Sequence, residues 1–168
     1  MEPTEEAQAL AVEAVGRFVG AKCWCVVAGA GTGSRVHLGF GASIPRQTEI
    51  RNPTLPDLVR RYEPDLSLLI GCAWRLIDRG EVVCGWQDSN LFGDAMLTGL
   101  SRLDGTEVES AAIHAPGNDL TLSFSGGVRL DVFADRTNSD ESDENYLVFV
   151  PERIVTIGIK SRIEIGAR

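Results

Sequence analysis

The sequence predicts an α+β fold, mainly antiparallel sheet with two helices, built from an internally duplicated helix-then-strands unit. Two segments carry apolar residues at helical spacing, and each is followed by segments in which apolar and polar residues alternate. The strand patterns recur along the chain, and Gly105 follows Gly20 by 85 residues. We therefore expect a single domain over residues 1–168, with one repeat at about 4–88 and the other at about 89–165.

Each repeat is expected to begin with an amphipathic helix. The first helix is expected over residues 4–19, where Thr4 can cap the first turn and Gly20 ends the helix. The second is expected to begin within residues 89–94 and to end at Gly105. The expected buried faces are Ala7, Leu10, Ala11, Ala14 and Phe18 on the first helix, and Met96, Leu97, Leu100 and Leu103 on the second.

Strands follow the two helices in the same order. They are expected at residues 23–28 and 36–40 in the first repeat, and at 107–114 and 120–124 in the second. The second repeat also has an added strand at residues 128–132. The residues expected to face the core are Val36, Leu38, Phe40, Leu120, Leu122, Phe124, Val128, Leu130 and Val132.

Each repeat is expected to close with a hairpin. The hairpins pair residues 69–76 with 82–86, and residues 145–150 with 154–159. A turn at residues 79–80 sets the register of the first hairpin. The side chains expected to face one another in the core are Trp74 with Cys84, Cys72 with Trp86, and Leu76 with Val82.

The composition is typical of a cytoplasmic globular protein. Of the 168 residues, 43% are hydrophobic and 24% are charged, which is close to globular averages. The N-terminal residues are acidic where a signal peptide is basic, and no apolar run reaches the roughly 20 residues that span a bilayer. Four cysteines do not make a disulfide framework, so reduced thiols are expected.

The net charge of −8 is concentrated in one region. Residues 103–152 contain 11 acids and 2 bases, which gives −9, and such a surface repels nucleic acid and anionic membrane. It favours encounter with a basic partner protein, although a solvated acidic face is the alternative. The acidic segment lacks the EF-hand glycine, which argues against a calcium site. The candidate partner-binding residues are Asp131, Asp135, Asp140, Glu141, Asp143 and Glu144.

The connection at residues 44–64 is rich in proline and arginine, whereas its counterpart in the second repeat is acidic. Guanidinium groups pair well with phosphate or carboxylate, so this connection is a candidate anion-binding site. The alternative is that its arginines pair with acidic residues inside the fold or across a dimer. The candidate residues are Arg46, Arg51, Arg60 and Arg61.

No motif predicts a catalytic residue, a metal site or a cofactor. The glycine-rich run at residues 29–34 precedes a strand rather than a helix, so it does not fit a dinucleotide-binding loop. The four cysteines lack the C-x-x-C spacing of zinc sites and are expected to be buried apolar groups. His37 and His114 belong to no local nucleophile motif.

Over about residues 20–135 the chain resembles a family of small uncharacterised bacterial proteins. The resemblance rests on Asn52-Pro53, Cys72-Ala73-Trp74-Arg75-Leu76, Trp86-Gln87-Asp88-Ser89-Asn90 and Asp119-Leu120-Thr121-Leu122-Ser123-Phe124. It implies no biochemical function. The size, the acidity and the lack of an active-site motif are also similar to those of immunity proteins that neutralise polymorphic toxins.

Three functional hypotheses follow from these patterns. The first is a non-enzymatic protein-binding domain of the immunity type, which meets a basic partner through the acidic face. The alternative is a small-ligand-binding or enzyme domain that holds an anionic ligand at residues 44–64. The third is a structural subunit that forms a homodimer through exposed sheet edges.

Overall fold

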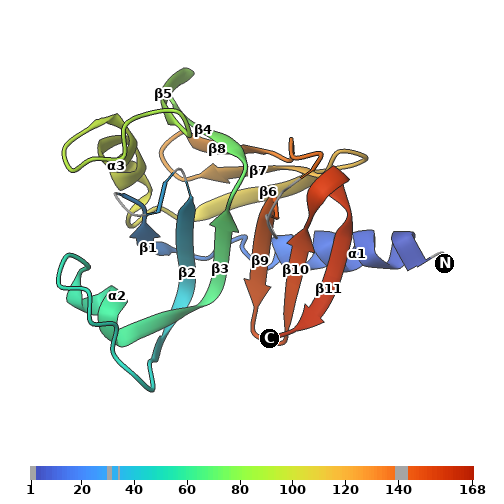
Figure 1. The fold of residues 1–168 in the computed structure, drawn as a ribbon, viewed down its shortest axis with the longest axis horizontal. Helices are drawn as coiled ribbons and strands as arrows, with labels where there is room; N and C mark the ends of the chain where they lie inside the picture. Colours follow the sequence, from blue (N-terminus) through green and yellow to red (C-terminus); the bar gives the residue numbers. More distant parts are fainter. Residues whose placement is uncertain (1–2, 30–31, 34, 139–143) are drawn as a thin grey trace.

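The computed structural model describes residues 3–29, 32–33, 35–138 and 144–168. The described residues form two antiparallel sheets and three α-helices, which confirms the predicted α+β class (Figure 1). The elements of the first half are α1 (Pro3–Gly16), β1 (Cys23–Val27), β2 (Val36–Pro45), α2 (Asp57–Arg61), β3 (Tyr62–Ile70), β4 (Ala73–Asp78) and β5 (Glu81–Gly85). Those of the second half are α3 (Ala95–Leu100), β6 (Val108–His114), β7 (Asp119–Phe124), β8 (Val128–Phe133), β9 (Tyr146–Val150), β10 (Arg153–Ile157) and β11 (Ile163–Ala167), with 3₁₀ turns at Ser101–Leu103 and Ile159–Ser161.

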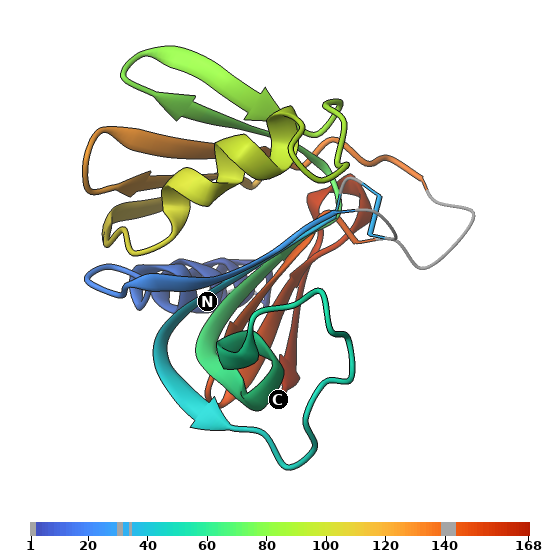
Figure 2. The same cartoon turned by 90° about the vertical axis from the view of Figure 1, so that its left-hand side faces the viewer.

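The two halves exchange strands. The first sheet has the order β1-β2-β3-β9-β10-β11, and the second has the order β5-β4-β8-β7-β6. Each half therefore places three consecutive strands in one sheet and its closing hairpin in the other, as the colours in Figure 2 show. The strand β8, expected as an addition to the second half, has the same place in its sheet as β3 has in the first.

The backbone joins the two halves through equivalent hydrogen bonds. The N–H of Gly20 donates to the carbonyl of Val108 over 2.8 Å, and the N–H of Gly105 donates to the carbonyl of Cys23 over 2.8 Å. The two donors, Gly20 and Gly105, are 85 residues apart in the sequence, and so are the two acceptors, Cys23 and Val108. The starts of β1 and β6 thus meet around an approximate twofold axis.

The core repeats in the same way. Phe40 and Phe124 are fully buried and stack with ring centroids 6.3 Å apart, and Phe18 meets Phe40 edge to face at 5.1 Å. Burying an apolar side chain of this size contributes roughly 2–3 kcal/mol. The buried helical positions are also spaced by 85: Ala11, Ala14, Val15 and Phe18 in the first half, and Met96, Gly99, Leu100 and Leu103 in the second.

The first closing hairpin differs from its predicted register. A bulge between Leu76 and Ile77 pairs Leu76 with Cys84 and Ile77 with Val82, so Trp74 does not lie opposite Cys84. Beyond the bulge, Val82 pairs with the outward-facing Ile77 and is 59% exposed. Trp86 follows the other end of β5 and is 42% exposed. The expectation that these two residues are buried is wrong. The other four, Cys72, Trp74, Leu76 and Cys84, are buried as expected.

The halves differ most in how their second and third strands connect. A tight turn joins β7 to β8, with Gly126 and Gly127 both at a φ of 82°. This turn, and not the acidic segment between β8 and β9, is the counterpart of the arginine-rich connection, so the expected pairing of the two connections is wrong. Between β2 and β3, residues 46–61 form a long projection, here called the arm, which includes α2 (Figure 2). No described helix is long and apolar enough to cross a membrane.

Candidate anion-binding site

The outer faces of the two sheets are built from equivalent positions. In the first sheet, His37 pairs with Leu69, which pairs with Leu147. In the second sheet the corresponding row is Thr121, Asp131 and Arg75. These rows lie opposite the buried faces, because the alternate residues of the same strands form the core.

On the second sheet this face is closed by ion pairs. Asp131 is buried, and one of its carboxylate oxygens lies 3.0 Å from Nε of Arg75 while the other lies 3.0 Å from Nε of Arg129. The guanidinium of Arg75 also lies over the ring of Phe133, 5.3 Å from its centroid. Asp131 therefore neutralises its neighbours and is not part of an exposed acidic face.

On the first sheet the equivalent face carries a cavity of about 400 Å³ between the sheet and the arm. We call it the arginine cavity, and its polar lining comes from β2, β3, the arm and the end of β11. The residues that give it its chemistry are His37, Arg46, Glu63, Ser67, Phe149 and Arg168.

Close packing between the base of the arm and the sheet sets the position of this cavity. A Cβ at Gly39 would lie 2.6 Å from Cγ of Pro64 and 2.7 Å from Cβ of Cys25, so only glycine allows this approach. Arg46 is then fixed by the arm itself, because its Nε donates to the carbonyl of Val59 over 3.1 Å. The nearest oxygen of Glu63 lies 3.7 Å from a terminal nitrogen of Arg46, which leaves this guanidinium with free donors.

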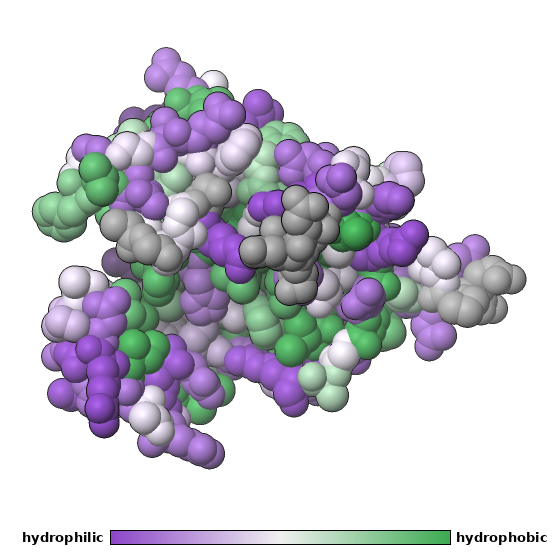
Figure 3. All heavy atoms as spheres, in the orientation of Figure 1, coloured by the Kyte–Doolittle hydropathy of each residue, from purple (hydrophilic) through white to green (hydrophobic). Residues whose placement is uncertain are grey.

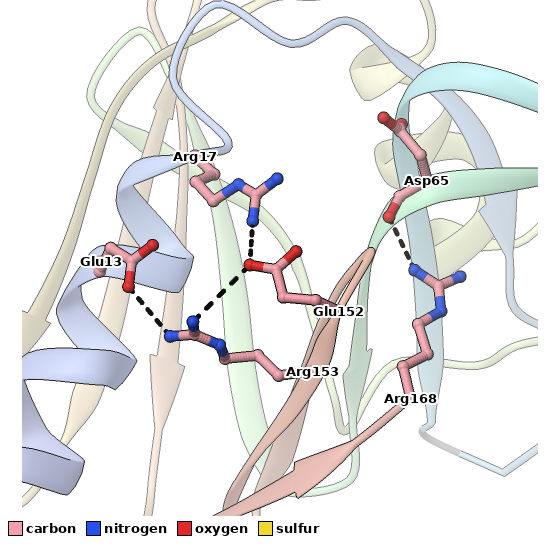
Figure 4. Close-up of polar contacts among 6 residues, drawn as sticks. All are labelled: Glu13, Arg17, Asp65, Glu152, Arg153 and Arg168. Atoms are coloured by element: carbon pink, nitrogen blue, oxygen red, sulfur yellow. Dashed lines mark hydrogen bonds and ion pairs between the residues drawn. The ribbon is translucent and has the colours of Figure 1, made fainter.

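The second guanidinium of the cavity belongs to Arg168. One terminal nitrogen donates to the carbonyl of Asp65 over 2.7 Å (Figure 4). The other donates to the carbonyl of Pro64 over 3.2 Å. Its guanidinium carbon lies 5.9 Å from the centroid of the Phe149 ring. These contacts hold a full positive charge beside the arginine cavity without a carboxylate partner among the described residues.

His37 is half-buried beside these two cations. Burial lowers the pKa of its imidazole, and the positive charges of Arg46 and Arg168 lower it further. The imidazole is therefore neutral at pH 7, and its side chain makes no hydrogen bond among the described residues. The thiol of Cys25 is not activated, because burial raises its pKa to about 11.

The four predicted arginines do not act together. Only Arg46 lines the arginine cavity. Arg60 braces the arm, since its side chain donates to the carbonyl of Ile50 over 3.0 Å and lies 2.9 Å from Glu49. The remaining two, Arg51 and Arg61, are exposed and have no side-chain partner in the described part of the chain.

The predicted acidic face is only partly visible in the structure. Asp135 is exposed and Glu144 is partly exposed. Three further candidates, Asp140, Glu141 and Asp143, lie outside the described residues. Within the described residues, no group of three or more His, Cys, Asp or Glu side chains is arranged to hold a metal ion.

Sequence reasoning missed the contributions of Ser67, Phe149 and Arg168 to the site. The alternation of β2 placed His37 on the outer face, and the same reasoning applied to β3 would have placed Ser67 beside it. Nothing in the local sequence indicates that Arg168 approaches Arg46. Comparisons with protein-family models, curated proteins and solved structures find no match to this chain.

Proposed function

We propose that this protein is a binding domain for a small anionic ligand, which it holds in the arginine cavity. The observation that carries the proposal is that Arg46 and Arg168 line one cavity together with the neutral imidazole of His37. Like charges held beside one another repel, and a bound anion between them relieves that repulsion.

The second sheet supports this reading. There, two guanidinium groups share one buried carboxylate, that of Asp131. The position equivalent to Asp131 in the first sheet is Leu69, which carries no charge. A bound anion supplies in the arginine cavity the negative charge that the protein itself supplies on the other sheet.

The lining favours a compact anion such as a phosphate, a sulfate or a small carboxylate. Guanidinium groups donate two parallel hydrogen bonds to such oxygens, and Ser67 adds a hydroxyl. Phe149 and Leu69 provide apolar wall on the same side. We propose binding rather than catalysis, because among the described residues no hydrogen bond joins His37 to Ser67 and the Cys25 thiol is protonated.

The test is thermal unfolding and titration calorimetry of the full chain with sulfate, phosphate, pyrophosphate and citrate, against chloride at equal ionic strength. A ligand at 100 times its dissociation constant adds about 2.7 kcal/mol to the free energy of unfolding. Arg168→Gln and His37→Gln should weaken the effect. Arg61→Gln is the matched control, since it removes an exposed charge outside the cavity. The proposal fails if no anion stabilises the protein more than chloride, or if Arg61→Gln weakens binding as much as Arg168→Gln.

A second candidate function, protein binding, is favoured by a separate group of exposed apolar side chains. Trp86 is 42%, Leu91 59% and Phe92 99% exposed, and aromatic residues of this kind form the centres of protein interfaces. Trp86 lines a small cavity of about 180 Å³ together with Asp135. The predicted contact with a basic partner would therefore combine apolar anchors with the acidic segment.

Protein binding can be tested with any basic protein that is recovered by pull-down with the full chain. Phe92→Ala should leave the dissociation rate unchanged if the contact is purely electrostatic, and should increase it if Phe92 is an anchor. Charge reversal at Asp135 and Glu144 should lower the association rate. Unchanged rates in both variants would remove this surface as the interface.

A further inference from the structure

A second cavity borders the arm and shares no lining residue with the arginine cavity. Its volume is about 370 Å³, and it lies between β1, the α2 region and the turn that follows α3. Figure 2 shows α2 and α3 on the same side of the molecule with strands of the first sheet between them. We call it the tryptophan cavity.

The walls of the tryptophan cavity are mostly apolar. Trp24 and Val26 line it from β1, Leu58 and Val59 from α2, and Leu97 from α3. Leu58 is 45% exposed, so its side chain has apolar surface that a ligand would remove from water. Figure 3 shows apolar surface within the hollow on this side of the molecule.

The polar groups of this cavity indicate the charge of its ligand. Asp104 lines it, and its side chain has no ion pair or hydrogen bond among the described residues. Trp24 already donates its indole N–H to the carbonyl of Gly41 over 3.0 Å. Ser101 donates its hydroxyl to the carbonyl of Thr98 over 2.6 Å. The cavity therefore offers a carboxylate, an aromatic ring and acceptor oxygens, but no free side-chain donor.

We infer that the tryptophan cavity binds a small organic cation with an apolar body, such as a primary amine on an aromatic ring. The ammonium group pairs with Asp104 and the aromatic face of Trp24, both of which attract positive charge. The apolar body lies against Val26, Leu58 and Leu97. The net charge of −8 also raises the local concentration of such a cation.

The same features argue against other ligands of similar size. An anion would meet the carboxylate of Asp104 without a positive side chain in the lining. A neutral molecule would gain the apolar contacts but not the ion pair. The tryptophan cavity carries the negative charge of Asp104, whereas the arginine cavity carries the positive charges of Arg46 and Arg168. The two cavities therefore select ligands of opposite charge.

The test uses three probes of nearly equal shape on the full chain: 2-phenylethylamine, 2-phenylethanol and phenylacetate. Titration calorimetry and ¹H–¹⁵N chemical-shift perturbation should give saturable binding of the amine, with shifts at Trp24 and Leu97. We expect Asp104→Asn to raise the dissociation constant of the amine about tenfold, since a charge-assisted hydrogen bond contributes enough free energy for that change. Asp135→Asn is the matched control and should leave binding unchanged.

Leu58→Ala is a second variant. Because Leu58 is partly exposed, this change should leave the fold intact, so binding can be measured even if the change at Asp104 impairs folding. This variant should lower the affinity for each of the three probes, because each loses the same apolar contact. The inference is overturned if the amine binds no better than the alcohol, if Asp104→Asn and Asp135→Asn have equal effects, or if no probe binds. Arg168→Gln should leave amine binding unchanged, which keeps this result separate from the test of the arginine cavity.

Discussion

The outer faces of the two sheets start from equivalent positions and end with different chemistry. On the second sheet, Asp131 lies between Arg75 and Arg129, and a short glycine turn leaves that face as a closed surface. On the first sheet, the arm brings Arg46 over a face that has Leu69 in place of the carboxylate. A long connection on one half of a repeated scaffold thus creates a cavity that the other half lacks, while the core beneath it stays the same.

The largest expected effect tests the shared core. Phe40→Ala and Phe124→Ala should each lower the free energy of unfolding by about 3–5 kcal/mol, because each leaves a cavity at the centre of both halves. Denaturant unfolding measures this. Phe92→Ala, at a 99% exposed position, is the matched control and should change stability by less than about 0.5 kcal/mol. Unequal losses at the two core positions would show that the halves are not energetically equivalent.

The next prediction exchanges the chemistry of the two faces. Leu69→Asp introduces into the first sheet the carboxylate that the second sheet has at Asp131. Because this carboxylate would pair with the arginines of the cavity, anions should no longer stabilise the variant in thermal unfolding. Leu69→Asn has the same shape without the charge and should keep part of the anion effect. Full retention in Leu69→Asp would contradict the assignment of the cavity.

The reverse change removes the carboxylate of Asp131 from the second sheet. Asp131→Asn should lower the free energy of unfolding by about 1–3 kcal/mol, because Arg75 and Arg129 lose a buried charged acceptor. These arginines are 45% and 47% exposed, so solvent screening places the expected loss toward the lower value. Chemical denaturation at low and high salt measures it. A stability equal to that of the original chain would mean that the pairs contribute nothing.

We expect the proposed anion site to depend on pH through His37. Its folded-state pKa lies below the ordinary value of 6.5, so the unfolded chain binds the proton more readily, and stability should fall as the pH drops below about 6.5. A bound anion raises this pKa again, so sulfate binding should tighten over the same range. The other charged side chains lining the cavity are Arg46, Glu63 and Arg168. His37→Gln should flatten the sulfate affinity between pH 5 and 7, as measured by calorimetry.

The smallest effect concerns how the two helices are attached. An exposed network of ion pairs joins α1 to the turn between β9 and β10 (Figure 4). Arg17 pairs with Glu152. Arg153 lies 2.9 Å from Glu13 and 3.7 Å from Glu152. Arg17 lowers the pKa of Glu152, so its contribution is present above the unfolded-state pKa and is lost as the pH falls through the folded value. Glu152→Gln should cause only a slight loss of stability at pH 7 in thermal unfolding, and high salt should cause a similar loss in the original chain.

The helix α3 is attached differently. A Cβ at Gly99 would lie 2.8 Å from Cβ of Cys84, so α3 packs against β5 closely enough to require glycine. The 3₁₀ turn after α3 also carries an ion pair, between Arg102 and Asp78. Salt should therefore weaken the attachment of α1 more than that of α3, which keeps its close packing against β5. Hydrogen exchange measured residue by residue can separate the two.

Local patterns in the sequence were sufficient to predict the class and the inward faces of the strands. The alternation in β2 and β7 placed Val36, Leu38 and Phe40 and their counterparts in the core, where the structure has them. This succeeds because alternation is a property of neighbouring residues. The short α2, the strand β11 and the start of β3 within the connection carried no comparable pattern and were not predicted.

Other features were decided by residues that are distant along the chain. The bulge in the first hairpin turns Val82 outward, and Arg75, 56 residues before Asp131, pairs with its buried carboxylate from the neighbouring strand. The exchange of hairpins between the sheets follows from which strand edges are free to pair, which single-strand patterns do not encode. The sequence alone therefore determined the repeated core, and only the tertiary structure decided that Arg46, His37 and Arg168 share one cavity, because their approach depends on the path of the arm and of β11.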